Sequence, residues 1–316
     1  MTSPPLARPT HVRYYVLAAL CVVTVVNYIQ RNSIGGMETT IRHDLTLEPT
    51  DTGAAMAVFF WSYAVMQIPT GLLAKRWGPR TALPFFIVGW SLATASLALA
   101  LGPFTLTAGR LAMGVFQAGV FPCATLIMVA WLPPARRALA SGILNSCMLI
   151  GGAAVSNLTA TLLAPAGPLT WRGLFLLYGL PGLLVAACFY YWFRDQPAEH
   201  RAVNAAELAV ISAGQKLSKA KGGIPWAIVL LSLPLWLICV QQFFRAGANR
   251  FTDQWLSTYL QEVPLSELAE GPRKRLANHL ASAPQYAGVV GGLIGGFISD
   301  WVLRRTGSRR AGRNGV

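Results

Sequence analysis

The stretch Asn27-Tyr28-Ile29-Gln30-Arg31 interrupts the first long apolar run of the chain. Residues 14–26 before it carry no charge, and residues 34–37 after it are uncharged again. A single helix over residues 13–42 would be about 43 Å long at 1.5 Å per residue, longer than the roughly 30 Å hydrocarbon core of a bilayer. We therefore expect a membrane-spanning helix in which Arg31 lies about one turn beyond the middle.

Arg31 at that depth should face protein or water, because a guanidinium near the bilayer centre costs about 3 kcal/mol on insertion scales. Two interpretations stay open for its role. The long side chain can reach the headgroup region and leave only its apolar stem in the membrane. Alternatively, it can bind an anion in a polar cavity.

Composition indicates an integral membrane protein, since 54% of the 316 residues are hydrophobic and only 12% are charged. The net charge of +14 would suit nucleic acid, but the charges fall in short loops between apolar runs. We therefore expect a lipid bilayer and no nucleic acid around the chain. The histidines lie outside the apolar runs, and no metal-ligand spacing or nucleophile–base pair appears, so we expect no metal, no cofactor and no enzyme chemistry.

Eight membrane spans can be assigned, and the expected fold is an all-α integral membrane bundle. The seventh span is long and interrupted. The spans cover residues 13–40, 53–74, 81–101, 105–131, 138–163, 172–193, 225–260 and 281–303. Residues 1–193 would form an amino-terminal bundle of six helices and residues 194–224 a linker. Residues 225–316 would begin a second bundle and end in a basic tail.

The lysines and arginines predict the orientation of the chain in the membrane. Of the 26, 17 lie in the amino terminus, the second, fourth and sixth loops and the tail, against 5 in the odd-numbered loops. The excess of positive charge marks the cytoplasmic side. We expect both termini in the cytoplasm, with the long and lysine-rich sixth loop there as a linker.

A short pattern recurs after the second and eighth spans. Each copy has a glycine at a helix end, a charged residue four positions later and then a tight basic turn. The copies are Gly71, Lys75, Arg76, Gly78 and Arg80 in the first, and Gly296 and Asp300 followed by 304–310 in the second. A period of six helices follows, as in secondary transporters built from parallel repeats.

This loop pattern resembles that of the major facilitator superfamily. Within it, the chain resembles the anion:cation symporters, which include sugar-acid permeases and the vesicular glutamate and sialic-acid transporters. The finer likeness is carried by 27–31, Phe60-Trp61-Ser62-Tyr63, Gln67-Ile68-Pro69, Gly109-Arg110, 114–117, Trp171-Arg172 and 307–310. The resemblance implies that Arg31 and Arg110 bind the anion and that the loop pattern works in conformational change.

Three departures from the family pattern change what is expected. Gln30 and Gln117 stand where the resemblance places proton-carrying acids, and Lys75 stands where the loop usually has aspartate. The family has twelve helices, so the chain looks truncated after the eighth. Other chains would then have to supply the missing helices, or the truncated transporter would be inactive.

The candidate binding residues lie on several expected spans. Arg31 and Arg110 would form a fork-shaped donor set suited to a carboxylate, although Arg110 could instead be a helix-end arginine near headgroups. The other candidates are Tyr28, Tyr63, Gln67, Asn145 and Arg245, and packing is the alternative role for the tyrosines. Arg250 and Asp253 are expected to pair with each other, since a pair lowers the cost of both charges.

The expected function is alternating-access transport of a small organic anion across the inner membrane. The resemblance implies a sugar acid such as a hexonate or hexuronate. The alternatives are a non-transporting membrane receptor or interaction subunit, and an intramembrane enzyme, which the lack of carboxylate and histidine pairs disfavours.

Overall fold

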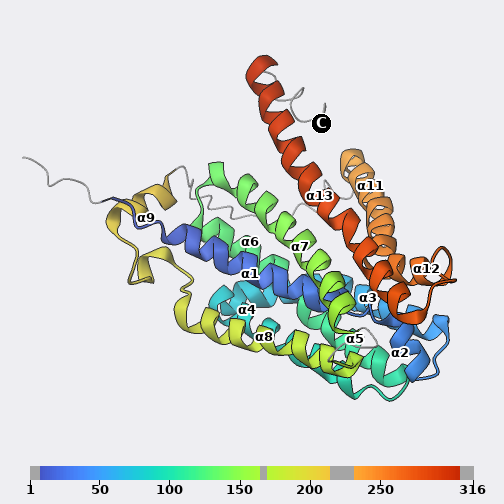
Figure 1. Ribbon diagram of the computed structural model, residues 1–316. Helices are drawn as coiled ribbons and strands as arrows, with labels where there is room; N and C mark the ends of the chain where they lie inside the picture. The colour runs from blue at the N-terminus through green and yellow to red at the C-terminus, as the bar shows by residue number, and fades with distance from the viewer. Residues whose placement is uncertain (1–7, 164–168, 214–230, 307–316) are drawn as a thin grey trace, which may run out of the picture.

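The computed structural model describes residues 8–163, 169–213 and 231–306, and within these ranges the chain is helical and contains no strand (Figure 1). Six helical segments are long and apolar enough to cross a membrane. They comprise α1 (Val12–Asn32), α3 (Pro49–Trp77), α4 (Pro79–Ser96) with the short η1 (Leu97–Leu99), α5 (Pro103–Gln117) with α6 (Val120–Trp131), α7 (Pro134–Leu162) and α8 (Trp171–Trp192). We call these segments the six-span bundle.

Proline marks where several of these helices begin. Pro49, Pro79, Pro103 and Pro134 each occupy the first position of their helix. A helix does not use the backbone N–H at that position, and the fixed φ of proline already suits the helix. The helix starts therefore follow from the sequence, and the first six expected spans are confirmed in number and order.

The first expected span is shorter than a continuous helix over 13–40. The helix α1 ends at Asn32, residues 33–37 form turns, and a separate short helix, α2 (Glu38–Asp44), follows. Glycine is among the weakest helix formers, and Gly35 and Gly36 fall in these turns. The expectation of one 43 Å helix is therefore wrong, and Arg31 lies in the last turn of α1 instead of near the middle of a long span.

The fourth expected span is also divided. Helix α5 ends at Gln117, and α6 begins at Val120 after Ala118 and Gly119. Pro122 has no N–H to donate to the carbonyl of Ala118, so the helical ladder is interrupted there. The break puts Gln117 at a helix end in the interior of the bundle.

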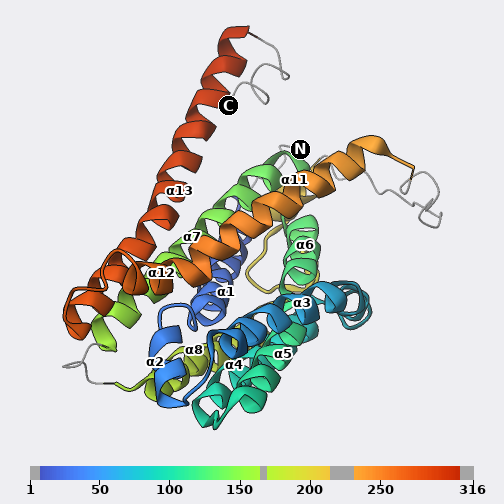
Figure 2. The same cartoon turned by 90° about the vertical axis from the view of Figure 1, so that its right-hand side faces the viewer.

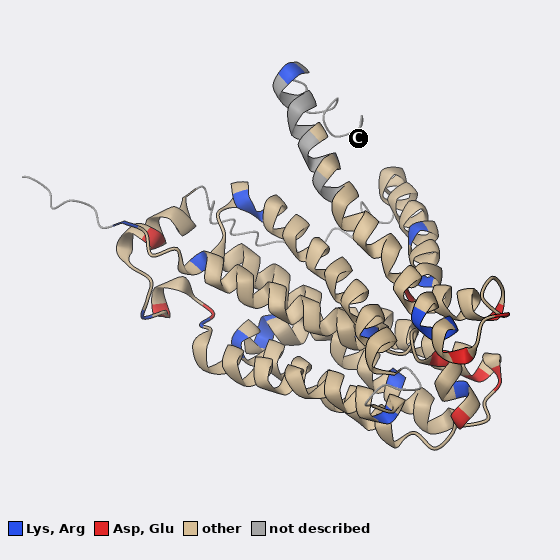
Figure 3. Cartoon of the chain, viewed as in Figure 1, with Lys and Arg blue, Asp and Glu red and all other residues tan. Residues whose placement is uncertain are grey.

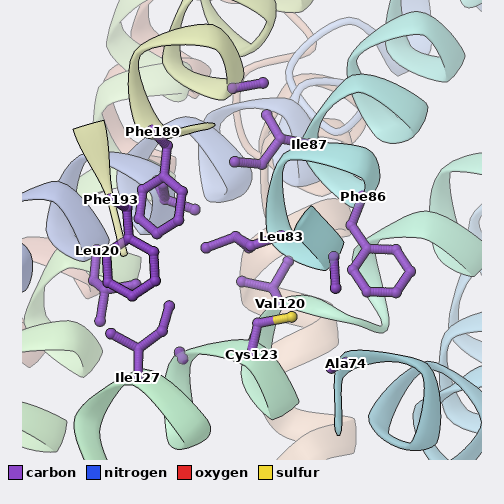
Figure 4. Close-up of a cluster of buried hydrophobic side chains, with 14 of the residues drawn as sticks. Leu20, Ala74, Leu83, Phe86, Ile87, Val120, Cys123, Ile127, Phe189 and Phe193 are labelled. Atoms are coloured by element: carbon purple, nitrogen blue, oxygen red, sulfur yellow. The ribbon is translucent and has the colours of Figure 1, made fainter. Parts of the chain in front are cut away.

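The core of the six-span bundle is apolar and continuous around α4. Figure 4 shows Leu83, Ile87, Val120, Ile127 and Phe189 from three helices converging on one buried cluster. Because lipid tails are as apolar as these side chains, the gain on burial in a membrane comes from close packing between the helices. Glycines allow the helices to approach: a Cβ on Gly151 of α7 would lie 2.7 Å from the carbonyl oxygen of Val25 in α1.

The residues that follow α8 pack back against the amino-terminal end of α1. A 3₁₀ turn (Pro197–Glu199) leads to α9 (Ala205–Ser212), whose Glu207 carboxylate is fully buried. Glu207 pairs with Arg13 at 2.6 Å and accepts hydrogen bonds from the backbone N–H groups of His11 and Arg13. The first part of the expected linker is thus a docked helix, while its lysine-rich part, within 214–230, lies outside the described residues.

The seventh and eighth expected spans correspond to a second group of helices, which we call the α11–α13 segment. It contains α11 (Leu233–Arg250), a π-helical turn (Phe251–Trp255), α12 (Leu256–Glu262) and α13 (Glu270–Thr306). The π turn is the expected interruption of the seventh span. Neither α11 nor the described part of α13 is among the six membrane-spanning candidates, because α11 carries Arg245, Arg250 and several amides.

The two groups meet at one end. In both Figure 1 and Figure 2 the C-terminal part of α13 projects away from the six-span bundle, while α12 and the start of α13 lie close to α2. The charged residues gather at the two ends of the six-span bundle, and its spans carry few charges between them (Figure 3). We call the interface between the two groups the α2–α12 contact.

Hydrogen bonds and ion pairs hold the α2–α12 contact. The buried Glu38 carboxylate accepts hydrogen bonds from Thr52 (2.8 Å) and Thr258 (3.0 Å), and it pairs with Arg42 at 3.0 Å. Arg42 also pairs with Glu262 on α12. These bonds join the two groups through polar side chains.

Candidate functional site

A polar cavity of about 440 Å³ lies between α1, α7, α11, the π turn and α13. Both groups of helices contribute to its wall. The lining residues with charged or amide side chains are Asn32, Asn145, Arg245, Asn249, Arg250, Asp253 and Gln285, joined by Tyr28 and Thr252. The structure therefore brings three of the candidate binding residues, Tyr28, Asn145 and Arg245, to one cavity.

Arg31 lies directly behind the Tyr28 side of this cavity and is 5% exposed. Its guanidinium carbon is 4.6 Å from the ring centre of Tyr63 and between 5.1 and 5.4 Å from those of Tyr28, Phe59 and Phe60. Aromatic faces attract a cation when it is shielded from water. The Nε of Arg31 has no hydrogen-bond partner among the described residues, so a donor remains for a ligand.

Arg110 occupies a different position from the expected fork. Its side chain is fully buried, its guanidinium carbon is 4.5 Å from the ring centre of Phe59, and Nη1 donates to the carbonyl oxygen of Arg31 at 3.3 Å. It does not line the cavity. Because Nε and Nη2 of Arg110 have no partner in the described part of the chain, it retains donors, but they point into the bundle behind Arg31.

Tyr63 and Gln67 lie on α3, beyond the lining of the cavity. Tyr63 supports Arg31 through its ring and interacts with both Arg31 and Gln67. Tyr63 and Gln67 therefore do not contact the cavity, and they can affect it only by positioning Arg31. Asn145 on α7 and Arg245 on α11 are exposed to the cavity.

Arg250 and Asp253 form the expected pair, with 3.5 Å between Nη1 and Oδ2. Both line the cavity, which the sequence did not indicate. The guanidinium carbon of Arg250 is also 4.7 Å from the ring centre of Phe60, the ring that Arg31 contacts. Polar residues at 249–253, one helical turn past Arg245, were the available signal for this part of the wall.

Gln30 and Gln117, at the positions of the family's acids, both face inward within the bundle. The Nε2 of Gln30 donates to the Tyr178 carbonyl oxygen at 2.7 Å, and its Oε1 accepts from Thr94 at 3.3 Å. Gln30 thus links α1 to α4 and α8 by hydrogen bonds. The Nε2 of Gln117 reaches the Asn27 carbonyl oxygen at 3.5 Å, and its buried Oε1 has no partner among the described residues.

The first copy of the loop pattern closes the end of the bundle where α8 ends. Gly78 adopts φ 77°, and a side chain there would overlap the Asp195 carboxylate, so glycine is required. Asp195 accepts a hydrogen bond from the backbone N–H of Arg80 at 2.8 Å. Burial raises the pKa of the Asp195 carboxyl, and the bond from Arg80 opposes that shift.

The remaining residues of the loop pattern are less constrained. Lys75 and Arg76 are exposed, and Gly71 packs on Pro122. Gly296 and Asp300 lie within α13, but their side chains fall outside those described, as do residues 307–310. Across the described ranges no three His, Cys, Asp or Glu side chains gather as a metal site would require.

Comparison with known proteins identifies relatives along nearly the whole chain. The model of the Major Facilitator Superfamily matches residues 20–315. The chain is 32% identical to the "Probable sulfoacetate transporter SauU" of Cupriavidus necator, over 96% of this chain and 69% of that protein. It is 28% identical to the "Probable galactarate/D-glucarate transporter GudP" of Escherichia coli, with the same two shares.

The solved structures show the same fold. A bacterial homolog of the human lysosomal transporter Spinster, in an inward-facing and unoccupied conformation, superposes with a TM-score of 0.72 at 22% identity. The superposition covers 96% of this chain and 64% of that one. The chain thus spans about two thirds of the length of the proteins it matches.

Proposed function

The chain belongs to the Major Facilitator Superfamily and is a multi-pass membrane protein, and on that premise we propose that the complete protein is a secondary carrier for a small organic anion. A sugar acid or a similarly short acid is the proposed substrate. The observation that carries the proposal is the cavity itself. Among the described residues, two arginines (Arg245 and Arg250) line the cavity together with one carboxylate, Asp253, and Arg31 lies behind its Tyr28 side.

Arginine suits this substrate class chemically. Its planar guanidinium donates two parallel hydrogen bonds to a carboxylate or sulfonate, and lysine does not match that geometry. The amides of Asn32, Asn145 and Gln285 supply donors and acceptors for hydroxyl groups. The names of relatives that carry galactarate, glucarate and sulfoacetate agree with this chemistry.

Alternating access is the proposed mechanism. The halves would be residues 1–193 and 225–316, joined by the linker 194–224, and they would rock about the cavity. The α2–α12 contact would close one side of the cavity. We propose the inner membrane as the location, with both termini in the cytoplasm, and no catalytic step.

A membrane receptor is the second candidate, because a site can bind without translocation. Uptake of labelled D-glucarate, D-gluconate and sulfoacetate into proteoliposomes containing the full-length protein, measured beside equilibrium binding, separates the candidates. A carrier accumulates or exchanges ligand across the membrane. Binding without any transmembrane movement would overturn the carrier proposal in favour of a receptor, and a chemically altered ligand would indicate an enzyme.

A further inference from the structure

Asp253 is an unexpected group in a cavity proposed for anions. Its carboxylate lines the same wall as Arg245 and Arg250, and its side chain is 15% exposed. A carboxylate repels an anionic ligand unless a cation compensates it. The compensating cation is Arg250, so the state of this pair decides how much positive charge the cavity offers.

The pair is weak by its geometry. The 3.5 Å between Arg250 Nη1 and Asp253 Oδ2 exceeds the 2.7–2.9 Å of a charge-assisted hydrogen bond. The buried Nη1 has no hydrogen-bond partner within the described ranges. A ligand acid group that accepts two hydrogen bonds from Arg250 would replace a weaker interaction by a stronger one.

The backbone allows the side chains to exchange partners without moving the helix. Arg250 is the last residue of α11, and Asp253 lies in the π-helical turn that follows. Such turns occur frequently at functional sites. The turn is held against Gly35, where a Cβ would lie 3.1 Å from the Asp253 carbonyl oxygen, so rotation of the side chains is the available motion.

Arg250 also lies beside a second cation. Its guanidinium and that of Arg31 contact the same ring, Phe60, at 4.7 and 5.4 Å. Arg245 precedes Arg250 by five residues, about 7.5 Å along the helix axis. The cavity thus offers cationic groups at two separated positions, which one short ligand with an acid group at each end can contact together.

We propose that Arg250 and Asp253 form an exchangeable ion pair, and that Arg250, when it leaves Asp253, makes the cavity selective for dianions over monoanions. Asp253 holds Arg250 while the cavity is empty, and the second acidic group of the substrate takes Arg250 from it. Asp253 limits the preference, because it competes for Arg250 and repels a dianion more strongly than a monoanion. The proposal rests on the proposed function and narrows its substrate class.

The test uses two ligands that differ by one acid group. D-glucarate and D-gluconate share a six-carbon polyhydroxy chain, and only glucarate carries a carboxylate at both ends. Titration calorimetry on the purified chain in lipid nanodiscs gives the two dissociation constants and their ratio. The ratio is insensitive to a loss of folded protein, because that loss affects both ligands equally.

The variants are expected to move the ratio in opposite directions. Asp253→Asn should raise the preference for glucarate at least threefold, because Arg250 is then free. Arg250→Lys keeps a charge opposite Asp253 but loses the paired donors, and it should lower the preference at least fivefold. Arg275→Lys, at an exposed α13 arginine away from the cavity, should leave the ratio unchanged.

The outcomes separate this proposal from the general function. A ratio that stays at the parent value in Arg250→Lys, or that falls in both variants, overturns the exchangeable pair while leaving an anion carrier in place. A parent chain that binds neither glucarate nor gluconate overturns the sugar-acid proposal, and the exchangeable pair with it. The lysine variant decides the matter alone when Asp253→Asn does not fold.

Discussion

The six-span bundle and the α11–α13 segment hold their polar groups in different ways. Gln30 and Arg110 are completely buried in the bundle and bonded to neighbouring backbone. No residue of α11 is buried, and Phe243 and Phe244 are 75% and 71% exposed. Burial fixes a side chain by packing, whereas exposed side chains on α11 are positioned mainly by their own helix. The polar side chains of the bundle are therefore fixed by packing, whereas few described neighbours restrict the side chains of α11.

The largest effect that tests this contrast comes from two glycines. Gly114→Val should destabilise the chain by about 3 kcal/mol or more, because the new Cβ overlaps Ser62 and the Phe59 carbonyl. Gly247→Val on α11 meets no atom within 4 Å and should change stability little. Thermal unfolding in detergent, followed by tryptophan fluorescence, measures both. Equal losses would show that α11 is as tightly packed as the bundle.

The arginines sharpen the comparison at the site. Arg31→Ala and Arg110→Ala should each weaken anion binding at least tenfold, about 1.4 kcal/mol. Arg31 supplies a donor, and Arg110 holds the Arg31 carbonyl. Arg31→Lys should restore binding only in part. Arg275→Ala serves as the control. Titration with a panel of sugar acids is the measurement, and parent-like binding by both alanine variants would remove these residues from the site.

A smaller loss of stability is expected when the exposed ion pair between Asp44 of α2 and Arg172 of α8 is removed. Asp44 accepts hydrogen bonds from Arg172 and Trp171, and these bonds, Arg172 first, lower the pKa of its carboxyl. A lowered folded-state pKa gives stability that is present above the unfolded pKa and is lost as pH falls through the folded value. Since the pair is about half exposed, Asp44→Asn should cost about 0.5 kcal/mol or less at pH 7.

The pH dependence of the melting temperature tests this ion pair. The difference in melting temperature between Asp44→Asn and the parent should shrink toward zero as the pH falls below the normal range of an aspartate. A difference that persists in acid would mean that the substitution acts through shape and packing.

A proton gradient is expected to have no effect on the accumulation of substrate. In the bundle, Gln30 and Gln117 occupy the positions of the family's acids, and an amide does not titrate. Asp253 in the other segment is held in an ion pair with Arg250, which it would have to leave to carry a proton. An inward proton gradient imposed on sealed vesicles, with the membrane potential clamped, should not concentrate the substrate. Uptake that a protonophore abolishes would contradict this and implicate Asp253.

Much of the fold could be predicted from the sequence because the relevant signals are local. Proline at helix starts, uncharged runs of membrane length and the Gly78 turn each act within a few residues. The Arg250–Asp253 pair was predictable for the same reason, since three residues separate its members. The breaks at Gly35 and Gly119 were harder, because apolar residues flank them and hydropathy does not register a turn.

The direction of buried side chains could not be predicted, because it depends on contacts between distant segments. Arg31 and Arg110 were expected to form one fork-shaped donor set, and they do meet. Whether Arg110 reaches a ligand or the Arg31 backbone depends on where Phe59 packs. Gln30 likewise turns toward Tyr178 and Thr94, which lie 148 and 64 positions away in the sequence.

The polar character of the α2–α12 contact has a consequence for how easily it separates. When an apolar seal opens, water meets hydrocarbon, at about 25 cal/mol for every Å² exposed. When Glu38 leaves Thr258, or Arg42 leaves Glu262, water can hydrate each group, so a bond to a charged group contributes only about 1.5–3 kcal/mol net when buried and less when exposed. Water that enters the contact thus lowers the free energy needed to open it. The contact can therefore open and close reversibly and still be well ordered when closed.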